Sequence, residues 1–197
     1  IKVYGEELLK SSDVEYREWN PYRSKLAAAI KNGLKELPLK QGSVVLYLGS
    51  SEGTTISHVS DVVGKDGLIF GIDIAERPMR KFIKICEERE NIVPILADAD
   101  KPEFYAEDLK GQAVDLLYQD ISQKNQAEIF LKNAEKFLLP GKHGMLVIKA
   151  RSISSIGSAK KIFEEQIGKL KEKFEILQTI DLAHFDKEHI LVHCRRK

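Results

Sequence analysis

One strand-to-helix junction constrains the fold of this chain more than any other stretch. The apolar run 44–48 is typical of a buried strand, and Gly49 and Gly53 separate it from a helix that begins at Thr54 and Thr55. Glycine lacks a Cβ and lets the backbone approach a ligand closely, and the first turn of a helix leaves N–H groups unpaired. The junction therefore predicts a ligand cradle at the end of a buried strand.

A carboxylate ends the next expected strand. Residues 68–73 form a second apolar run that closes with Asp73, 24 residues after Gly49. In a doubly wound sheet such an acid lies beside the tip of the first strand and accepts both hydroxyls of a ribose. The Gly-x-x-x-Gly spacing lacks the third glycine of the dinucleotide motif and the Lys-Ser/Thr ending of a P-loop. It favours a smaller nucleoside ligand without phosphates, such as S-adenosylmethionine, over a nicotinamide cofactor or an ordinary glycine turn.

Strands and helices alternate along the chain, which is typical of an α/β fold with a largely parallel sheet. The expected strands span residues 44–49, 68–73, 92–96, 113–118, 144–148, 174–182 and 189–194. The expected helices span residues 21–34, with Asn20-Pro21 as the cap, then 54–63, 76–88, 123–138 and 157–173. The junction 183–188 is short enough for an antiparallel pair. We therefore predict a Rossmann-like sheet of seven strands, six parallel and one reversed.

Residues 1–18 do not fit this alternation. The stretches Val3–Gly5 and Val14–Tyr16 favour short strands. We expect residues 1–18 to form a strand-rich N-terminal segment. Because the sequence does not begin with Met, we also expect this segment to be truncated. Residues 19–197 are expected to form one domain, since a chain of 197 residues can bury a sizeable single core.

Composition excludes several classes of protein. Lys and Arg total 31 and Asp and Glu total 30, so no excess charge indicates a polyanionic partner. No apolar stretch approaches the ~20 residues of a membrane span, and no signal-peptide pattern is present. Cys86 and Cys194 are isolated, so we expect neither disulfides nor a metal site. These features are typical of an intracellular, soluble protein that is not attached to a membrane.

Polar residues follow the expected strands at one edge of the sheet. Asp98 follows the third strand, Asp120 the fourth and Lys149 the fifth. Ligands of open α/β sheets bind beyond the carboxyl ends of the strands, so these side chains are expected beside Gly49 and Asp73. Each has a simpler reading, because an Asp after a strand often caps a turn and a Lys there is often a solvated charge. Their common position favours a single site.

The segments Trp19–Ile30, Leu46–Asp61 and Ile148–Ile153 resemble the fibrillarin family in its archaeal form. The resemblance covers nearly all of the chain from Val3 onward. It implies a class I S-adenosylmethionine-dependent methyltransferase that modifies ribose 2′-hydroxyls of rRNA and tRNA. It also implies a box C/D particle with guide RNA and target RNA, a Nop-domain scaffold protein and a kink-turn-binding protein. The expected location is cytoplasmic for an archaeal cell, or nucleolar for a eukaryotic one.

The resemblance also implies roles for individual residues. Its catalytic set falls on Lys25, Asp120, Lys149 and His189. Its cofactor-binding set falls on Gly49, Gly53, Thr54, Thr55, Asp73, Asp98, Ala99, Asp120 and Gln123. Three departures concern cofactor affinity, because the family usually has Ala-Ala-Ser at residues 50–52, Glu at position 73 and Ala-Gln-Pro at residues 122–124. Glu52 then adds a charge near the methionine end of the cofactor.

Methyl transfer to a hydroxyl is an in-line displacement that needs alignment and removal of a proton. Lys149 is the candidate to contact the ribose oxygen, either as a base or as a positive charge beside the developing alkoxide. Asp120 would orient Lys149, and Lys25 would add a second positive charge. His189 could shuttle the proton or position a lysine, although a histidine that opens a strand is more often structural.

Contacts to RNA are less clearly encoded. Basic residues could form a rim around the site, and Tyr22 could stack on a base; the residues concerned are Arg23, Lys25, Arg151, Lys160 and Lys161. The lysines of the last helix also fit a solvated face. Two other functions remain open: a protein (glutamine) methyltransferase of the same fold, and a non-catalytic structural subunit of the particle. A nicotinamide oxidoreductase fits the glycine spacing poorly.

Overall fold

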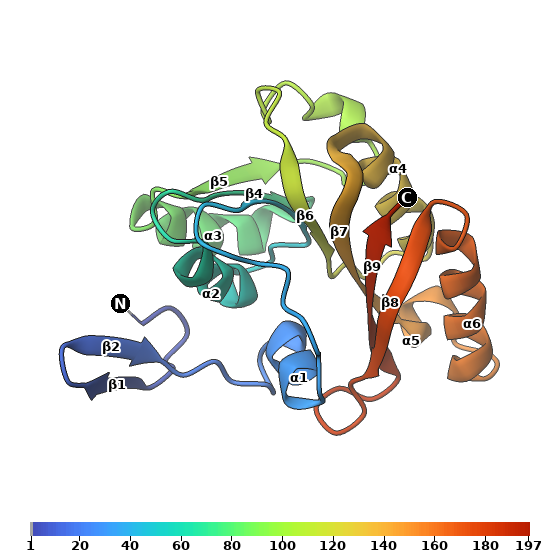
Figure 1. Cartoon of the computed structure of the whole chain (residues 1–197), viewed down its shortest axis with the longest axis horizontal. Coiled ribbons are helices and arrows are strands. Elements are labelled where there is room, and N and C mark those ends of the chain that lie inside the picture. Colours follow the sequence, from blue (N-terminus) through green and yellow to red (C-terminus); the bar gives the residue numbers. More distant parts are fainter. Residues whose placement is uncertain (1) are drawn as a thin grey trace.

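The computed structural model describes residues 2–197, which form a seven-stranded sheet with helices on both faces (Figure 1). The strand order is β5-β4-β3-β6-β7-β9-β8, and only β9 runs antiparallel to its neighbours. The seven strands are β3 (Val44–Leu48), β4 (Leu68–Asp73), β5 (Ile92–Leu96), β6 (Val114–Gln119), β7 (Leu138–Lys149), β8 (Phe174–Asp181) and β9 (His189–Arg196). The predicted sheet, with six parallel strands and one reversed, is confirmed.

Two apolar clusters cover the two faces of the sheet, because central parallel strands are buried on both sides. One cluster packs α1 (Lys25–Lys31), α2 (Thr54–Val63) and α3 (Glu76–Glu87) against the sheet. The other packs α4 (Gln126–Phe137) and α6 (Ala159–Leu170) against the opposite face. Among residues 2–197, no helix is both long and apolar enough to cross a membrane.

The first helix differs from its prediction. It begins at Lys25 rather than near Pro21, and it ends at Lys31. The Asn20 side chain accepts a hydrogen bond from the backbone N–H of Tyr22 at 2.9 Å and so closes a turn of its own. Ser24 is the actual N-cap, because its hydroxyl accepts from the N–H of Ala27.

Other boundaries also move. The expected helix 157–173 is the shorter helix α6, and the sequence predicts neither the short helix α5 (Ala150–Ile153) nor the 3₁₀ turn η1 (Pro102–Phe104). Strand β7 begins at Leu138, six residues before the predicted start at 144, and its register to β6 shifts after Val114. Such an irregularity hides a strand from sequence analysis, because it breaks the alternation of side chains.

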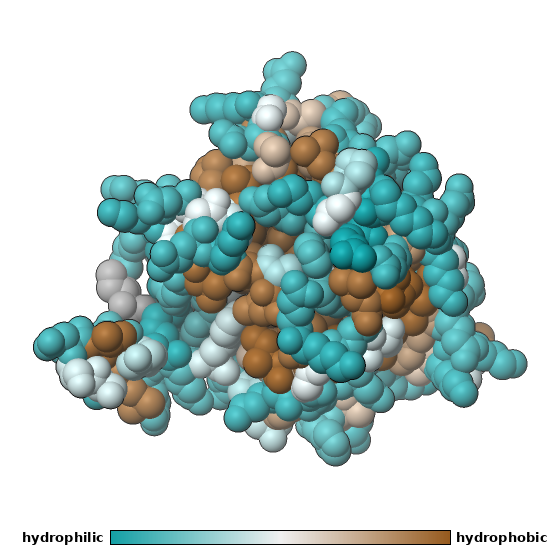
Figure 2. Space-filling model, viewed as in Figure 1, coloured by the Kyte–Doolittle hydropathy of each residue, from teal (hydrophilic) through white to brown (hydrophobic). Residues whose placement is uncertain are grey.

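The N-terminal strands form a separate two-stranded sheet of β1 (Leu8–Ser11) and β2 (Val14–Arg17). The expected strand at Val14–Tyr16 is confirmed. The one at Val3–Gly5 is wrong, because the Glu6 carboxylate accepts hydrogen bonds from the N–H groups of Val3 and Tyr4 and bends the chain there. This hairpin lies away from the main sheet and carries apolar side chains at its surface (Figure 2), those of Leu9, Val14 and Tyr16.

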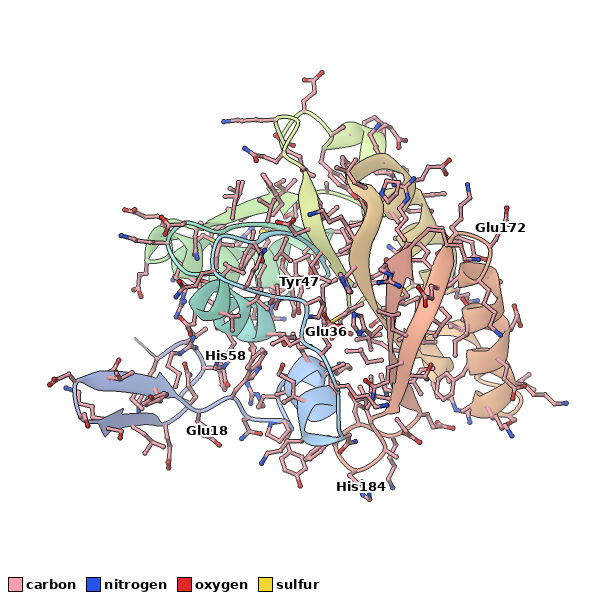
Figure 3. All side chains as sticks on the ribbon, in the orientation of Figure 1. Glu18, Glu36, Tyr47, His58, Glu172 and His184 are labelled. Carbon is pink, nitrogen blue, oxygen red and sulfur yellow. The ribbon has the colours of Figure 1, made fainter. Side chains whose placement is uncertain are left out.

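His58 of α2 fastens the N-terminal segment to the main sheet (Figure 3). Its ring stacks on Trp19 with centroids 5.0 Å apart, and its Nε2 lies 2.7 Å from the hydroxyl of Tyr4. Arg17 adds ion pairs to Glu6 and Asp61. Burial first, and then the charge of Arg17, lower the pKa of His58 from 6.5 to about 4.

This contact predicts a pH-dependent stability. Because the pKa of His58 is lower in the folded chain, its stabilising contribution is complete above pH 6.5 and is lost as the pH falls toward 4. Between pH 7 and pH 5 the loss is up to about 2 kcal/mol. Urea unfolding at both pH values should show a smaller pH dependence in His58→Gln than in the wild type. Equal pH dependence in the two proteins would contradict the assignment.

Candidate active site

A cavity of about 410 Å³ lies at the carboxyl ends of the central strands. The strand order reverses between β3 and β6, and ligands of open α/β sheets bind at such a switch point. Six of the predicted site residues line this cavity: Gly49, Asp73, Ala99, Asp120, Gln123 and Lys149. The cavity is therefore where the sequence predicts the site.

Gly49 and Gly53 of the strand-to-helix junction are each required by a different close contact. Gly49 adopts a φ of +90°, and a Cβ there would lie 2.3 Å from the carbonyl oxygen of Asp120. The bare backbone lets the tips of β3 and β6 meet under the cavity. Gly53 has a φ of +93°, and a Cβ there would collide with Ile85 and Phe82 of α3. Gly53 is thus required by the packing of α2 on α3, and it does not line the cavity.

Asp73 is fixed at the rim by backbone donors. Its carboxylate accepts from the N–H of Ser51 at 2.7 Å and from the N–H of Ala75 at 2.9 Å. A carboxylate has about four lone-pair positions, so acceptor capacity remains for the hydroxyls of a ribose. Asp98, by contrast, accepts from the N–H of Asp100 at 3.0 Å in a turn and does not line the cavity, whereas its neighbour Ala99 does.

The helix-opening threonines also lie outside the cavity wall. Thr55 bonds the hydroxyl of Ser24 at 3.1 Å, so it joins α2 to the start of α1. Thr54 lines a second, more open pocket beneath the N-terminal segment. Glu52 lies at that second pocket as well and pairs with Lys81 at 2.7 Å. The extra charge at position 52 is thus partnered on α3.

The predicted catalytic residues meet in one line of alternating charges. Lys149 Nζ lies 2.8 Å from Asp120 Oδ1, and Lys25 Nζ lies 3.3 Å from Asp120 Oδ2. Lys25 also lies 3.4 Å from Asp186 Oδ2, and Asp186 Oδ1 lies 3.0 Å from His189 Nδ1. These five residues are called the charge chain below. It joins the tips of β6, β7 and β9 to the first turn of α1.

The charge chain fixes the protonation of its central members. Burial alone raises the pKa of Asp120, but the adjacent Lys149 and Lys25 together lower it by more and leave it below its usual value. Burial alone lowers the pKa of Lys25, but Asp120 and Asp186 raise it above its usual value. Asp120 is therefore an anion and Lys25 a cation at neutral pH. Lys25 cannot serve as a base in this state.

Two stacked tyrosines lie beneath Asp120. The ring centroids of Tyr47 and Tyr118 are 4.6 Å apart, and both side chains are almost fully buried, with Tyr47 near the centre of the molecule (Figure 3). Burial raises the pKa of both hydroxyls, and the charge of Asp120 raises it further. They stay neutral and keep water from the inner side of the carboxylate, which strengthens its pairing with the lysines.

Sequence reasoning missed two members of the site. Asp186 lies in the β8–β9 junction, for which the sequence predicts no chemistry, although it precedes His189 by three residues. This junction, which contains the labelled His184, lies beside α1 (Figure 3). Ser122 departs from the family pattern, which has Ala there, and its hydroxyl oxygen lies 3.1 Å from Lys149 Nζ. The sequence signal that could have identified Asp186 is its position three residues before His189, which begins β9 at the same edge of the sheet.

The predicted basic rim is largely engaged in other contacts. Arg151 forms an ion pair with Glu188, and the Arg23 guanidinium lies 5.6 Å from the ring centroid of Tyr4. The ring of Tyr22, which is 72% exposed, stands edge-on to Phe185 at a centroid distance of 5.0 Å. Tyr22 precedes Lys25 by three residues, and Phe185 directly precedes Asp186. This aromatic pair therefore adjoins the charge chain.

The fold and the site define a class I methyltransferase: a doubly wound sheet with one reversed strand and an acid-rimmed nucleoside cavity at its switch point. The fibrillarin family model matches residues 1–197. A "fibrillarin-like rRNA/tRNA 2′-O-methyltransferase" of Pyrobaculum islandicum is 50% identical, over 100% of this chain and 84% of that protein. This chain belongs to the fibrillarin family.

Solved structures agree. Aeropyrum pernix fibrillarin, determined with natively bound S-adenosyl-L-methionine, superposes with a TM-score of 0.90 at 43% identity, over 98% of this chain and 84% of that one. The fibrillarin in a fibrillarin/Nop5p complex superposes with a TM-score of 0.88 at 41% identity, over 92% of this chain and 85% of that one.

Gly49→Ala should disable the cofactor site. The new methyl group would collide with the Asp120 carbonyl and force the tips of β3 and β6 apart. Gly141→Ala is a matched control, because Gly141 also has a positive φ, of +81°, but a Cβ there meets nothing within 4 Å. Both variants should lose roughly 1 kcal/mol of stability to backbone strain at positive φ, and Gly49→Ala should lose more because of the collision. Calorimetry should show binding of S-adenosylmethionine weakened tenfold or more, on the order of 1.4 kcal/mol, in Gly49→Ala alone; equal losses would contradict this reading.

Proposed function

We propose that this chain is an S-adenosylmethionine-dependent ribose 2′-O-methyltransferase that acts on rRNA and tRNA. One observation carries the proposal: a largely buried carboxylate, Asp120, holds the ammonium group of Lys149 at the wall of a nucleoside-sized cavity. Such an arrangement suits a reaction in which an oxygen must lose its proton while negative charge develops on it. A structural subunit does not require it, because a buried ion pair by itself contributes little net stability.

The residues of the cavity fit the cofactor. Its volume of about 410 Å³ falls in the usual range of small-molecule sites. Asp73 presents free acceptor capacity for ribose hydroxyls at one end. Among the described residues that line the cavity, Asp73 and Asp120 are the acids and Lys149 is the one base, and Lys149 is paired with Asp120. The remaining charge of Asp73 attracts a cationic ligand and offers little to a pyrophosphate.

When bound, S-adenosylmethionine supplies a methyl group made electrophilic by a positively charged sulfur. The chain then has to hold the ribose 2′-oxygen in line with that methyl group and stabilise the charge on it. Lys149 lies where it can do this, since Asp120 and Ser122 both fix its ammonium group. Lys25 neutralises the other side of Asp120 and prevents the carboxylate from repelling the developing alkoxide. We therefore assign Lys149 the role of an electrostatic clamp.

Partners are expected to present the RNA. The net charge of the chain is +1, and Arg23 and Arg151 are engaged within the protein, so electrostatic affinity for free RNA should be weak. A Nop-domain scaffold, a kink-turn-binding protein and a box C/D guide RNA would bring the target to the site, and the Tyr22 ring could stack on one of its bases. The related fibrillarin solved with Nop5p supports the scaffold. Because the relatives are archaeal, we propose a cytoplasmic particle.

Replacing Lys149 tests this function. Lys149→Ala should lower methyl transfer on the order of a hundredfold and leave cofactor affinity within a few fold, because the lysine acts on the ribose oxygen. Lys142→Ala is the matched control: Lys142 lies on the same strand and pairs with Asp115 at 2.7 Å, far from the cavity. Assembled particles with guide RNA, target RNA and labelled cofactor give the rates. Unchanged transfer by Lys149→Ala would reject the proposal.

A further inference from the structure

One hydrogen bond of His189 determines which of its ring nitrogens carries a proton. Its Nδ1 lies 2.7 Å from the carbonyl oxygen of Lys187, its hydrogen-bond partner, and Oδ1 of Asp186 lies 3.0 Å from the same nitrogen as an ion-pair partner. A carbonyl oxygen only accepts, so Nδ1 must be the donor. The neutral ring therefore has its lone pair on Nε2, which has no hydrogen-bond partner among residues 2–197. A free Nε2 in this tautomer is ready to accept a proton.

The position of His189 places that nitrogen near the reaction. His189 is directly opposite Lys149 in the antiparallel pairing of β7 with β9. Side chains of directly opposed residues lie on the same face, with Cβ atoms about 4.5–5.5 Å apart. An oxygen held beside the Lys149 ammonium is therefore within one side-chain length of the imidazole. The His189 side chain is 19% exposed, so a bound substrate can reach it.

We propose that Asp186 and His189 form a dyad in which Nε2 of His189 takes the proton of the ribose 2′-hydroxyl and Asp186 is the positioning residue. This inference rests on the proposed function. It names an acceptor for the proton of the 2′-hydroxyl, which Lys149 does not take if it acts only as an electrostatic clamp. The Lys187 carbonyl holds the ring in the Nδ1–H tautomer, and the Asp186 carboxylate, 3.0 Å from the same nitrogen, compensates the positive charge that the ring acquires. Lys25 in turn fixes Asp186, at 3.4 Å.

The step balances in atoms and charge. The ribose oxygen forms its bond to the methyl carbon with a lone pair, the carbon–sulfur bond breaks, and its electrons neutralise the sulfonium. The O–H bond breaks toward Nε2, so the products are a methyl ether, a neutral thioether and an imidazolium. The imidazolium then releases its proton to water. No oxidant, reductant or metal takes part.

Several charges face the imidazole, and they differ in sign. Lys149 on β7 and Lys25 on α1 oppose a positive ring, while Asp186 favours it. Asp120 offsets both lysines. Glu188, the residue just before His189, turns its carboxylate to Arg151. Asp186 is therefore the one carboxylate in the described chain that is paired with the ring, and Glu188 serves as a control of equal charge.

The dyad can be tested on the free chain by NMR. Nitrogen shifts of His189 should show the neutral ring with its proton on Nδ1, and Asp186→Asn should change the shifts of both ring nitrogens, because it removes the charge 3.0 Å from Nδ1. Glu188→Gln removes the same charge one residue from His189 and should change these shifts much less, because its carboxylate is paired with Arg151. An Nε2–H tautomer, or equal changes in both variants, would overturn the dyad. These spectra require no methyl transfer, so they remain informative even if the chain is not an RNA methyltransferase.

The second arm measures kcat against pH in assembled particles. Asp186→Asn should lower kcat at pH 7 roughly tenfold or more, leave KM for the cofactor unchanged and move the acidic limb to lower pH. Asp186→Glu should restore part of kcat, and Glu188→Gln should resemble the wild type. An unchanged profile in Asp186→Asn would overturn the proton-acceptor role. Absence of transfer by the wild-type particle would instead reject the proposed function, which separates the two failures.

Discussion

The site depends on one largely buried carboxylate. Asp120 directly follows β6 at the point where the strand order reverses, and it holds Lys149 at 2.8 Å and Lys25 at 3.3 Å. Without it Lys149 would have no carboxylate partner among residues 2–197, and an unpaired charge in a low-dielectric site is costly. The neutral pair of Tyr47 and Tyr118 beneath it excludes water. The catalytic geometry therefore follows from the packing of the sheet.

Much of this arrangement could be predicted from the sequence. The runs that became β3 and β4 are almost wholly apolar, as strands covered on both faces must be, and β6 has the apolar centre Leu116–Tyr118. These runs predict the central strands of the sheet and its switch point. Because ligands bind beyond the carboxyl ends of such strands, Asp73, Asp120 and Lys149 could be grouped before any distance was known. The resemblance to fibrillarin added Lys25 and His189, which lie on elements whose periodicity points to no chemistry.

The rest could not be predicted, because it depends on contacts between distant segments. The start of α1 depends on Ser24, whose hydroxyl also accepts a bond from the indole of Trp19, whereas Asn20 caps a turn. Gly53 has the pattern of a ligand-binding glycine but is required by Ile85 of α3. Asp186 becomes part of the site only because the β8–β9 junction folds against α1. Composition and spacing do not encode such juxtapositions.

The most direct test of this account compares two target RNAs that differ by a single atom. The assembled particle is given labelled S-adenosylmethionine with a target that carries a ribose at the guided position, or with the same target carrying a 2′-deoxyribose there. The account predicts label on the first RNA and none on the second, because the methyl acceptor is the 2′-oxygen beside Lys149. Equal labelling of both RNAs, or label on protein in place of RNA, would contradict it.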